Sequence, residues 1–378
     1  MLGLPTESAQ EMKQVHYKHE MRKVVHESNI QAVSLDNVQQ LDDPDIAEIL
    51  KTLQYPVVVK PCRGMTSKGV KKVTDEASMR QAVHMLHEDK GISTEYGILI
   101  ETYVDGPEFD ANFVLWEGQV LFLEITDNFP CLADASSATL ADNFAETVQI
   151  SNTILPPNEV EMIRSSVLRS LLKLGLKSGV FHCEGRIMNS SMRYKDVHGN
   201  GVDLVASSAA TAGQKPEVFL IEINVRPPGT GGTWATLLTY GVDLGALQFL
   251  RALNDRTRFE ALSAPFAYSS SNPGDGGGAQ WWTAHCMIPI HCDKIRVPEN
   301  FFEKLYGALP EIVPHVTRAE MYATPGTVVS TTAGIGWIAY MLLGTRISRA
   351  HALHMYQHVA ETSKKVLNAS SYDSGYES

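Results

Sequence analysis

One segment, residues 217–226, constrains the fold and the chemistry of this chain more than any other. It reads Glu-Val-Phe-Leu-Ile-Glu-Ile-Asn-Val-Arg, and apolar and polar residues alternate along its second half. This two-residue period predicts a β-strand in which Glu222, Asn224 and Arg226 share one face, about 7 Å apart. Mg²⁺ prefers oxygen ligands and accepts one or two carboxylates beside phosphate oxygens. The segment therefore predicts a face for a divalent cation and a phosphate, and the alternative is an ordinary exposed strand face.

The preceding strand, predicted over residues 179–188, repeats this arrangement with His182 and Glu184 on one face. If the two strands pair as a hairpin, Glu184 lies beside Glu222 and Asn224. Two adjacent carboxylates repel each other unless a divalent cation neutralises them. We therefore expect one or two Mg²⁺ ions here, and we interpret His182 as a packing or supporting residue rather than a ligand.

A glycine- and serine-bearing loop, residues 62–69, follows the apolar strand 57–59 and Lys60. Backbone N–H groups of such a loop can surround phosphate oxygens, and glycine allows a close approach. The loop matches neither GxxxxGK[ST] nor GxGxxG, which disfavours the two nucleotide-binding folds with those motifs. Lys60 is then either aimed at an anion or an exposed strand end.

A third candidate segment is the strand that begins near Ile98 and leaves the core as Glu101-Thr102-Tyr103-Val104. Its backbone could pair with the edge of an adenine ring. Glu108 follows an Asp-Gly-Pro turn and could accept hydrogen bonds from ribose hydroxyls. The alternative is an ordinary strand and turn.

The rest of the chain predicts an α+β fold with mostly antiparallel strands. Residues 113–124 indicate a hairpin that turns at Glu117-Gly118. Small and polar residues over 189–216 indicate a solvated insertion within a second hairpin, and those over 269–278 a linker. A C-terminal module of strands and a final helix, 348–367, follows. This order does not match the strict βαβ alternation of a doubly wound fold.

Charge and composition exclude several classes of function. The chain has 378 residues and 32 basic against 43 acidic ones, so a nucleic-acid partner is not expected. No apolar run reaches the ~18–20 residues of a membrane span, and the N-terminus does not resemble a signal peptide. The five cysteines are scattered and form no CxxC pair. We therefore expect a cytoplasmic protein without membrane contact.

The order of these motifs resembles the ATP-grasp superfamily, most of all its carboxylate–amine ligases of the L-amino acid ligase and carnosine synthase type. The resemblance runs from about Lys18 to Leu253. Its motifs, in chain order, are Lys18, Val-Val-Val-Lys60-Pro, Glu101 to Gly-Pro-Glu108, Glu184, and Glu222-Ile-Asn224-Val-Arg226.

The resemblance implies that a carboxylate and ATP form an acyl phosphate, which an amine attacks to give an amide, ADP and phosphate. ATP and two Mg²⁺ ions, or Mn²⁺ in their place, would be the cofactors. The implied site consists of Lys18, Lys60, Ser67 and Gly69 around the phosphates; Glu101, Thr102, Tyr103, Val104 and Glu108 around adenine and ribose; Glu184, Glu222 and Asn224 as metal ligands; and Arg226 and Arg186 as catalytic residues that stabilise the acyl phosphate and tetrahedral intermediate.

The resemblance also implies an ATP-grasp fold of two α+β subdomains with an added C-terminal module. The expected divisions are an N-terminal tail with linking helices (1–53), a lid (54–100), a core (101–268), the C-terminal module (279–367) and a tail (368–378).

Only 17 residues precede Lys18, whereas the family usually has an N-terminal α/β domain there. The chain is therefore expected to lack most of that domain, and a homodimer or a partner chain could supply it. One alternative is a nucleotide-binding but catalytically silent partner subunit. Another is an enzyme that resembles biotin carboxylases. The expected partners of an active ligase are a small carboxylate and an amine of amino-acid type.

Overall fold

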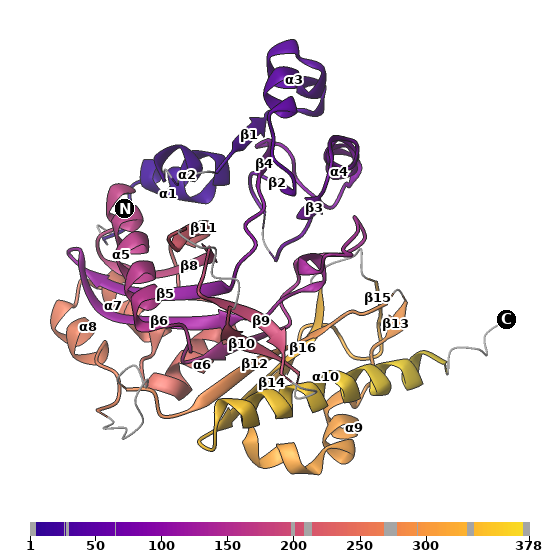
Figure 1. Cartoon of the computed structure of the whole chain (residues 1–378). Coiled ribbons are helices and arrows are strands. Elements are labelled where there is room, and N and C mark those ends of the chain that lie inside the picture. Colours follow the sequence, from indigo (N-terminus) through magenta and orange to yellow (C-terminus); the bar gives the residue numbers. More distant parts are fainter. Residues whose placement is uncertain are drawn as a thin grey trace.

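The computed structural model describes residues 5–25, 27, 30–64, 66–197, 201–207, 214–267, 278–292, 294–330 and 336–372. Two antiparallel sheets dominate these residues (Figure 1). The four-stranded sheet is formed by residues between 32 and 102, and the eight-stranded sheet lies below it in this view. Helices α1 (Ala9–His16) and α2 (Lys18–Val24) lie at the side of the junction. The predicted α+β class with antiparallel strands is confirmed.

The four-stranded sheet has the order β1 (Ala32–Leu35), β4 (Ile98–Thr102), β2 (Val57–Pro61) and β3 (Lys71–Val73). Helix α4 (Glu76–Glu88) begins after Asp75, whose side chain accepts a hydrogen bond from the N–H of Ser78 at 2.7 Å. Its Met79 and Val83 pack with the strand valines, together with η1 (Val38–Asp42) and α3 (Pro44–Lys51). We call this unit the lid; it has its own apolar core.

The eight-stranded sheet has the order β11 (Glu217–Asn224), β8 (Gly179–Met188), β5 (Glu108–Trp116), β6 (Gln119–Asn128), β7 (Val148–Ser151), β12 (Trp282–Pro289), β16 (Trp337–Thr345) and β14 (Val316–Met321). The predicted turn at Glu117 and Gly118 is present, and both residues have positive φ angles. Strand β5 begins at Glu108, five residues before the predicted start at Phe113.

The two faces of this sheet differ in chemistry. On one face, buried side chains such as Phe109, Phe113 and Phe181 pack against Ile163 and Val167 of α5 (Pro157–Lys173). The opposite face carries the polar residues of the same strands. Three helices, α6 (Thr230–Tyr240), α7 (Leu244–Ala252) and α8 (Arg256–Leu262), contribute to the packing on that side.

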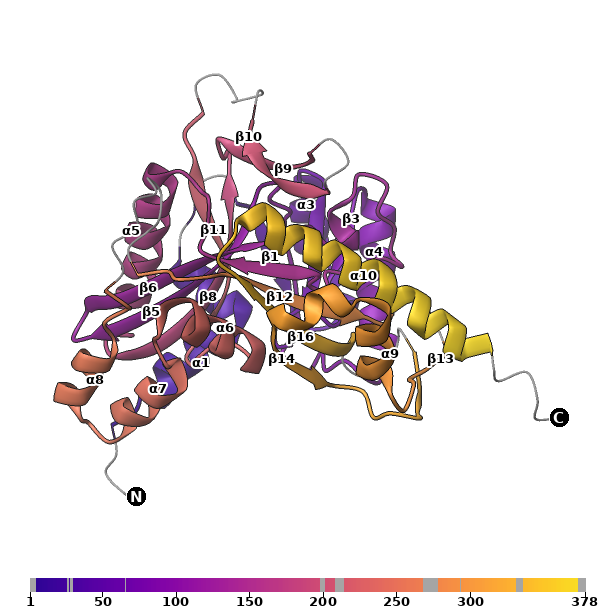
Figure 2. The same cartoon turned by 90° about the horizontal axis from the view of Figure 1, so that it is seen from below.

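Three C-terminal strands complete the eight-stranded sheet, while β13 (Ile295–Arg296) and β15 (Val328–Val329) pair in a small sheet of their own. Strand β12 pairs with β7, with Ala284 opposite Ile150, and β16 and β14 continue from it. Figure 2 shows the long helix α10 (Arg349–Tyr372) across this part of the sheet. The shorter elements here are α9 (Phe301–Ala308), η3 (Pro310–His315), β13 (Ile295–Arg296) and β15 (Val328–Val329).

The expected insertion over 189–216 contains a β-hairpin, formed by β9 (Met192–Asp196) and β10 (Val202–Ala206). It is ordered because it has partners: the Tyr194 ring lies 4.9 Å from that of Phe129, and Arg349 donates to Asp203 at 2.8 Å. Residues 198–200 and 208–213 of the insertion lie outside the described residues, as do 269–277 of the expected linker and 373–378 of the expected tail. None of the helices within the described ranges is long and apolar enough to cross a membrane.

Candidate active site

Three neighbouring strands place carboxylates side by side on the polar face of the eight-stranded sheet. Glu222 on β11 lies directly opposite Glu184 on β8, and Glu184 lies opposite Asp110 on β5. Asn224 lies two residues along from Glu222, opposite His182. The structure therefore brings together the predicted metal residues Glu184, Glu222 and Asn224, and we call Asp110, Glu184, Glu222 and Asn224 the acidic row.

The polar face extends beyond the residues that sequence reasoning singled out. Asp110 accepts hydrogen bonds from the side-chain amides of Asn128 (2.7 Å) and Gln149 (2.8 Å), and Gln149 also bonds to His285 (3.1 Å). The alternation of polar residues in β5 was the available signal, but it was hidden because the strand was expected to begin at Phe113. The polar side chains that sequence reasoning missed are Asp110, Asn112, Glu124, Asn128, Glu146, Gln149 and His285.

His182 contacts two carboxylates of the acidic row. Its Nε2 lies 3.4 Å from Glu184 and 3.9 Å from Asp110, while its Nδ1 bonds to Asn112 at 2.9 Å. Burial alone would lower the pKa of His182, but the Asp110 and Glu184 carboxylates outweigh it and raise that pKa to about 9. His182 is therefore an imidazolium that holds Glu184, which agrees with its interpretation as a supporting residue.

Negative charge is concentrated at this point of the sheet. Burial raises the pKa of Glu146 well above its ordinary value, and the nearby carboxylates of Asp110, Glu184 and Glu108 add to the effect. Burial would also raise the pKa of Glu184, but His182 outweighs it and lowers that pKa. Several carboxylates of the same charge at one point favour the binding of a cation.

The donor set suits a magnesium ion that completes its coordination with phosphate oxygens. Two carboxylates in register and one amide provide the oxygen ligands that Mg²⁺ prefers, and they leave positions for ATP and water. Lys18 Nζ lies 2.7 Å from Glu222 and offsets part of the negative charge. Among the described residues, no group of three or more His, Cys, Asp and Glu side chains could hold a metal ion.

Two of the predicted phosphate contacts, Lys60 of the lid and Lys18 of α2, lie near each other. Lys60, on β2, is buried and forms an ion pair with Glu101 on β4. Arg22 donates to the other oxygen of Glu101 at 3.1 Å, and the Lys18 backbone N–H donates to the carbonyl of Cys62 at 2.9 Å. Burial lowers the pKa of Lys60, while Glu101 opposes that shift.

Glu101 has a different environment from the adenine contact that the resemblance implied. Burial would raise its pKa, but Arg22 and Lys60 outweigh the effect and lower it. Glu101 is only 1% exposed, and its carboxylate pairs with two cations, Arg22 and Lys60. The backbone of Thr102, Tyr103 and Val104 continues from it toward β5 and forms the connection between the lid and the large sheet.

The predicted phosphate loop packs against the lid itself. Thr66 and Ser67 have positive φ angles, and so does Gly69 at +79°. A Cβ at Gly69 would lie 2.6 Å from Leu86 of α4 and 2.7 Å from Ile92, so this position needs glycine. The structure thus places Ser67 and Gly69 on the lid, apart from the acidic row, and their contact with phosphate stays a prediction.

The two predicted catalytic arginines face different surroundings. Arg226 is exposed, its Nη1 donates to the Pro227 carbonyl at 2.8 Å, and its charge lowers the pKa of Glu184. Arg186 is buried and turned toward the connection between lid and sheet, where it donates to Glu108 and to the Val104 carbonyl. Arg226 is therefore the arginine beside the acidic row.

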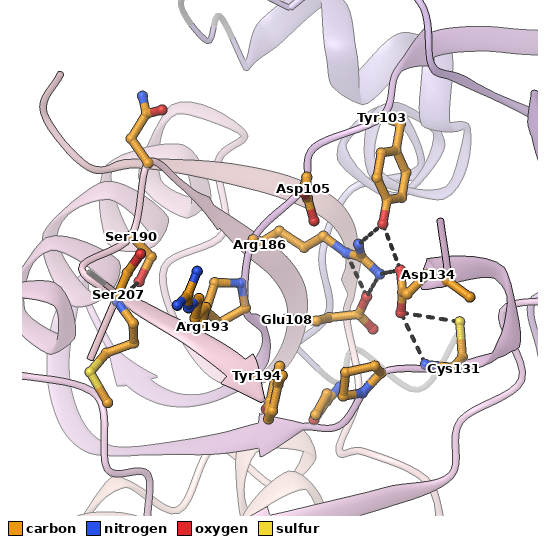
Figure 3. A pocket seen from close by; sticks show the side chains of 17 residues that line it. Tyr103, Asp105, Glu108, Cys131, Asp134, Arg186, Ser190, Arg193, Tyr194 and Ser207 are labelled. Carbon is orange, nitrogen blue, oxygen red and sulfur yellow. Dashed lines mark hydrogen bonds and ion pairs between the residues drawn. The ribbon is translucent and has the colours of Figure 1, made fainter. Parts of the chain in front are cut away.

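A cavity of about 590 Å³ opens beside this connection (Figure 3). It is lined by Tyr103 and Glu108, the residues expected around adenine and ribose, and by Arg186. Asn128, Asp134 and the hairpin residues Arg193 and Tyr194 form other parts of its wall. The lining residues are mixed in charge and include two aromatic rings, which suits a ligand with a flat ring and hydroxyl groups.

With this geometry established, comparison with known proteins identifies the domain. Residues 53–202 match the family described as the ATP-grasp domain. Residues 53–202 of this chain are an ATP-grasp domain. This match spans the lid strands β2, β3 and β4, the connection at 102–108 and strand β8 with Glu184. The predicted resemblance to the ATP-grasp superfamily and the predicted ATP-grasp fold are confirmed.

Individual relatives agree with this assignment. The ATP-grasp enzyme fsqD of Aspergillus fumigatus is 32% identical over 317 residues, which cover 82% of this chain and 53% of that enzyme. Human carnosine synthase 1 is 24% identical over 293 residues, 68% of this chain and 34% of the synthase. This ATP-grasp chain therefore spans about half the length, or less, of these curated relatives.

Solved structures show the same fold. The crystal structure of an L-amino acid ligase from Bacillus licheniformis superposes with a TM-score of 0.66 at 18% identity, and the alignment covers 95% of this chain and 74% of the ligase. The resemblance at this level of identity concerns the ATP-grasp fold alone.

Proposed function

We propose that this chain is an ATP-dependent ligase that joins a carboxylate to an amine and releases ADP and phosphate. The observation that carries the proposal is the register of Glu184 and Glu222, with Asn224 two residues along, beside Lys18. The named activities of the ligase and synthase relatives support it. The cofactors would be ATP and two Mg²⁺ ions.

In the proposed complex, the backbone of 102–104 pairs with adenine and Glu108 accepts the ribose hydroxyls. Lys18 and Lys60 contact the phosphates. Glu184, Glu222 and Asn224 would hold Mg²⁺, which supplies charge neutralisation at the phosphates. Most of the catalysis is then positioning and electrostatic stabilisation by fixed groups.

The proposed reaction has two steps. An oxygen of the substrate carboxylate attacks the γ-phosphorus of ATP, so that a C–O–P bond forms and ADP leaves. The amine nitrogen then attacks the acyl carbon and forms a C–N bond. The C–O bond to the phosphate breaks, its electron pair leaves on the phosphate, and the nitrogen gives up its surplus protons. Arg226 would stabilise the negative charge of the acyl phosphate and the tetrahedral intermediate, and its influence on Glu184 supports this role.

The surroundings of the acidic row support substrates of amino-acid type. Within the row, the side-chain partners of Asp110 among the described residues are Asn128, Gln149 and His182, with no arginine or lysine. Carboxylates in that position attract an ammonium group. We further place the protein in the cytoplasm, because all five cysteines are free and a reducing compartment keeps them so.

The test is incubation of the purified chain with ATP, Mg²⁺ and pooled amino acids. We expect release of ADP and phosphate together with a new amide in the mass spectrum, and no release from Glu222→Gln. ATP binding without turnover in any mixture would instead indicate the nucleotide-binding partner subunit. Size-exclusion chromatography with and without lysate would then show whether a second chain binds, and the ADP assay of the mixture would show whether it restores activity.

A further inference from the structure

Asp134 lies at the centre of a hydrogen-bond network on the wall of the 590 Å³ cavity (Figure 3). It ends the short helix η2 (Leu132–Asp134). Its Oδ1 accepts hydrogen bonds from the Tyr103 hydroxyl at 2.8 Å and from Arg186 Nη2 at 2.7 Å. Its Oδ2 accepts from the Cys131 backbone N–H at 3.0 Å and from the Cys131 thiol at 3.2 Å. The carboxylate therefore has a fixed position.

Arg186 is shared between Asp134 and Glu108. Its Nε donates to Glu108 Oε2 at 2.8 Å, and its Nη2 lies 2.7 Å from the same oxygen. Its Nη1 donates to the Tyr103 hydroxyl and the Val104 carbonyl. One guanidinium thus holds both the lid connection and the carboxylate proposed to accept ribose.

The two carboxylates respond differently to this shared cation. Burial would raise the pKa of Asp134, but Arg186 and the Cys131 N–H outweigh it and lower that pKa. Burial raises the pKa of Glu108, and Arg186 does not overcome the effect, partly because the charge of Asp134 adds to it. Asp134 is therefore the better stabilised partner of Arg186.

We propose that Asp134 is a positioning residue of the nucleotide pocket, which holds Arg186 so that Glu108 stays available to the ribose hydroxyls. The inference rests on the proposed function, because it assumes that the cavity receives the nucleoside of ATP. Without Asp134, Arg186 would have Glu108 as its one carboxylate partner in this network. Its contacts with Glu108, which now go to Oε2, could then extend to both oxygens, and the ribose would lose its acceptor.

The test compares Asp134→Asn with a control of the same chemistry, Asp45→Asn. Asp45 is exposed on α3 and lies outside the lining of the cavity, so its replacement removes one negative charge without touching the pocket. Affinities for Mg²⁺–ATP and Mg²⁺–2′-deoxy-ATP are measured by calorimetry, and kcat and KM with the amino-acid mixture. A 2′-deoxy nucleotide lacks one of the hydroxyls that Glu108 would accept.

For Asp134→Asn we expect ATP to bind about tenfold more weakly, the loss of roughly one charge-assisted hydrogen bond. The preference for ATP over 2′-deoxy-ATP should fall toward one, while kcat at saturating ATP stays within about twofold of the wild type. Asp45→Asn should keep both the affinity and the preference.

Three results would overturn the inference. Asp134→Asn could keep the wild-type preference, it could weaken both nucleotides equally, or Asp45→Asn could reproduce its effect. If Asp134→Asn does not fold, Tyr103→Phe decides, because it removes one donor to Asp134 and one acceptor of Arg186; it should lower the preference in the same direction. Failure of the wild type to bind ATP would instead refute the proposed function.

Discussion

Replacement of Glu27 by glutamine tests the charge network that joins the lid to the large sheet. Glu27 pairs with Arg22, which also donates to Glu101 of the lid and to the Leu220 carbonyl of β11 at 2.6 Å. The Leu220 N–H donates back to Glu27 at 2.6 Å. Burial raises the pKa of Glu27 to about 7, and Arg22 and the Leu220 N–H only partly oppose the effect.

The sign of the pH dependence follows from this raised pKa. The ordinary value is 4.5, so protonation of Glu27 contributes stability that is fully present below 4.5 and is lost as the pH rises through about 7. The difference between the two values corresponds to about 3 kcal/mol, because each pH unit is worth ~1.4 kcal/mol. Glutamine cannot ionise, so the difference between the variant and the wild type isolates this one group.

The assay is urea unfolding of both proteins from about pH 5 to about pH 8. Glu27→Gln should lower the free energy of unfolding by the same amount at every pH, because glutamine makes a weaker contact with Arg22. On top of that cost, it should gain up to about 3 kcal/mol over the wild type as the pH rises through this range. Glu88→Gln, at the exposed end of α4, controls for the removal of one negative charge. A difference for Glu27→Gln that is the same at every pH would refute the raised pKa.

Three further substitutions test the site and the lid. Glu222→Gln and Asn224→Ala should each lower kcat by at least about 100-fold and change the unfolding free energy by only about 1 kcal/mol; a stability loss of core-deletion size in urea titrations would contradict their place on the open face. Lys60→Met should weaken ATP binding in calorimetry at least about tenfold and destabilise the lid by about 3 kcal/mol, because a buried ion pair is broken; unchanged ATP affinity would remove Lys60 from the site. Gly69→Ala should cost about 1–3 kcal/mol in thermal unfolding, since φ is +79° and the new Cβ meets two side chains; a melting temperature equal to the wild type would show that the loop relaxes freely.

The acidic row could be predicted because its signal is local. Period-two alternation places Glu222 and Asn224 on one face of a strand, and a short-range hairpin partner then brings Glu184 beside them. The same logic applies to Asp110, but it requires the correct strand start. Glu108 follows a Gly-Pro turn, so we did not expect the strand to begin there.

The partners of the long charged side chains could not be predicted from the sequence. Strand alternation gives the face on which Arg186 begins, but its guanidinium reaches Asp134, which is distant in the chain and belongs to η2. Glu101 likewise meets Arg22 of α2 through the contact between lid and helix. Such pairs depend on the tertiary arrangement and on rotamers, which leave no periodic signal.

The pairing of β12 with β7 has a consequence for any attempt to shorten this protein. Strand β7 has only four residues, and its outer side is satisfied by a strand that begins at Trp282. A truncation before Trp282 would expose Val148 and Ile150 along an open, unprotected edge, which is a template for aggregation. The strands before residue 268 and those after Trp282 should therefore unfold as one cooperative unit, and we expect a fragment that ends at residue 268 to aggregate.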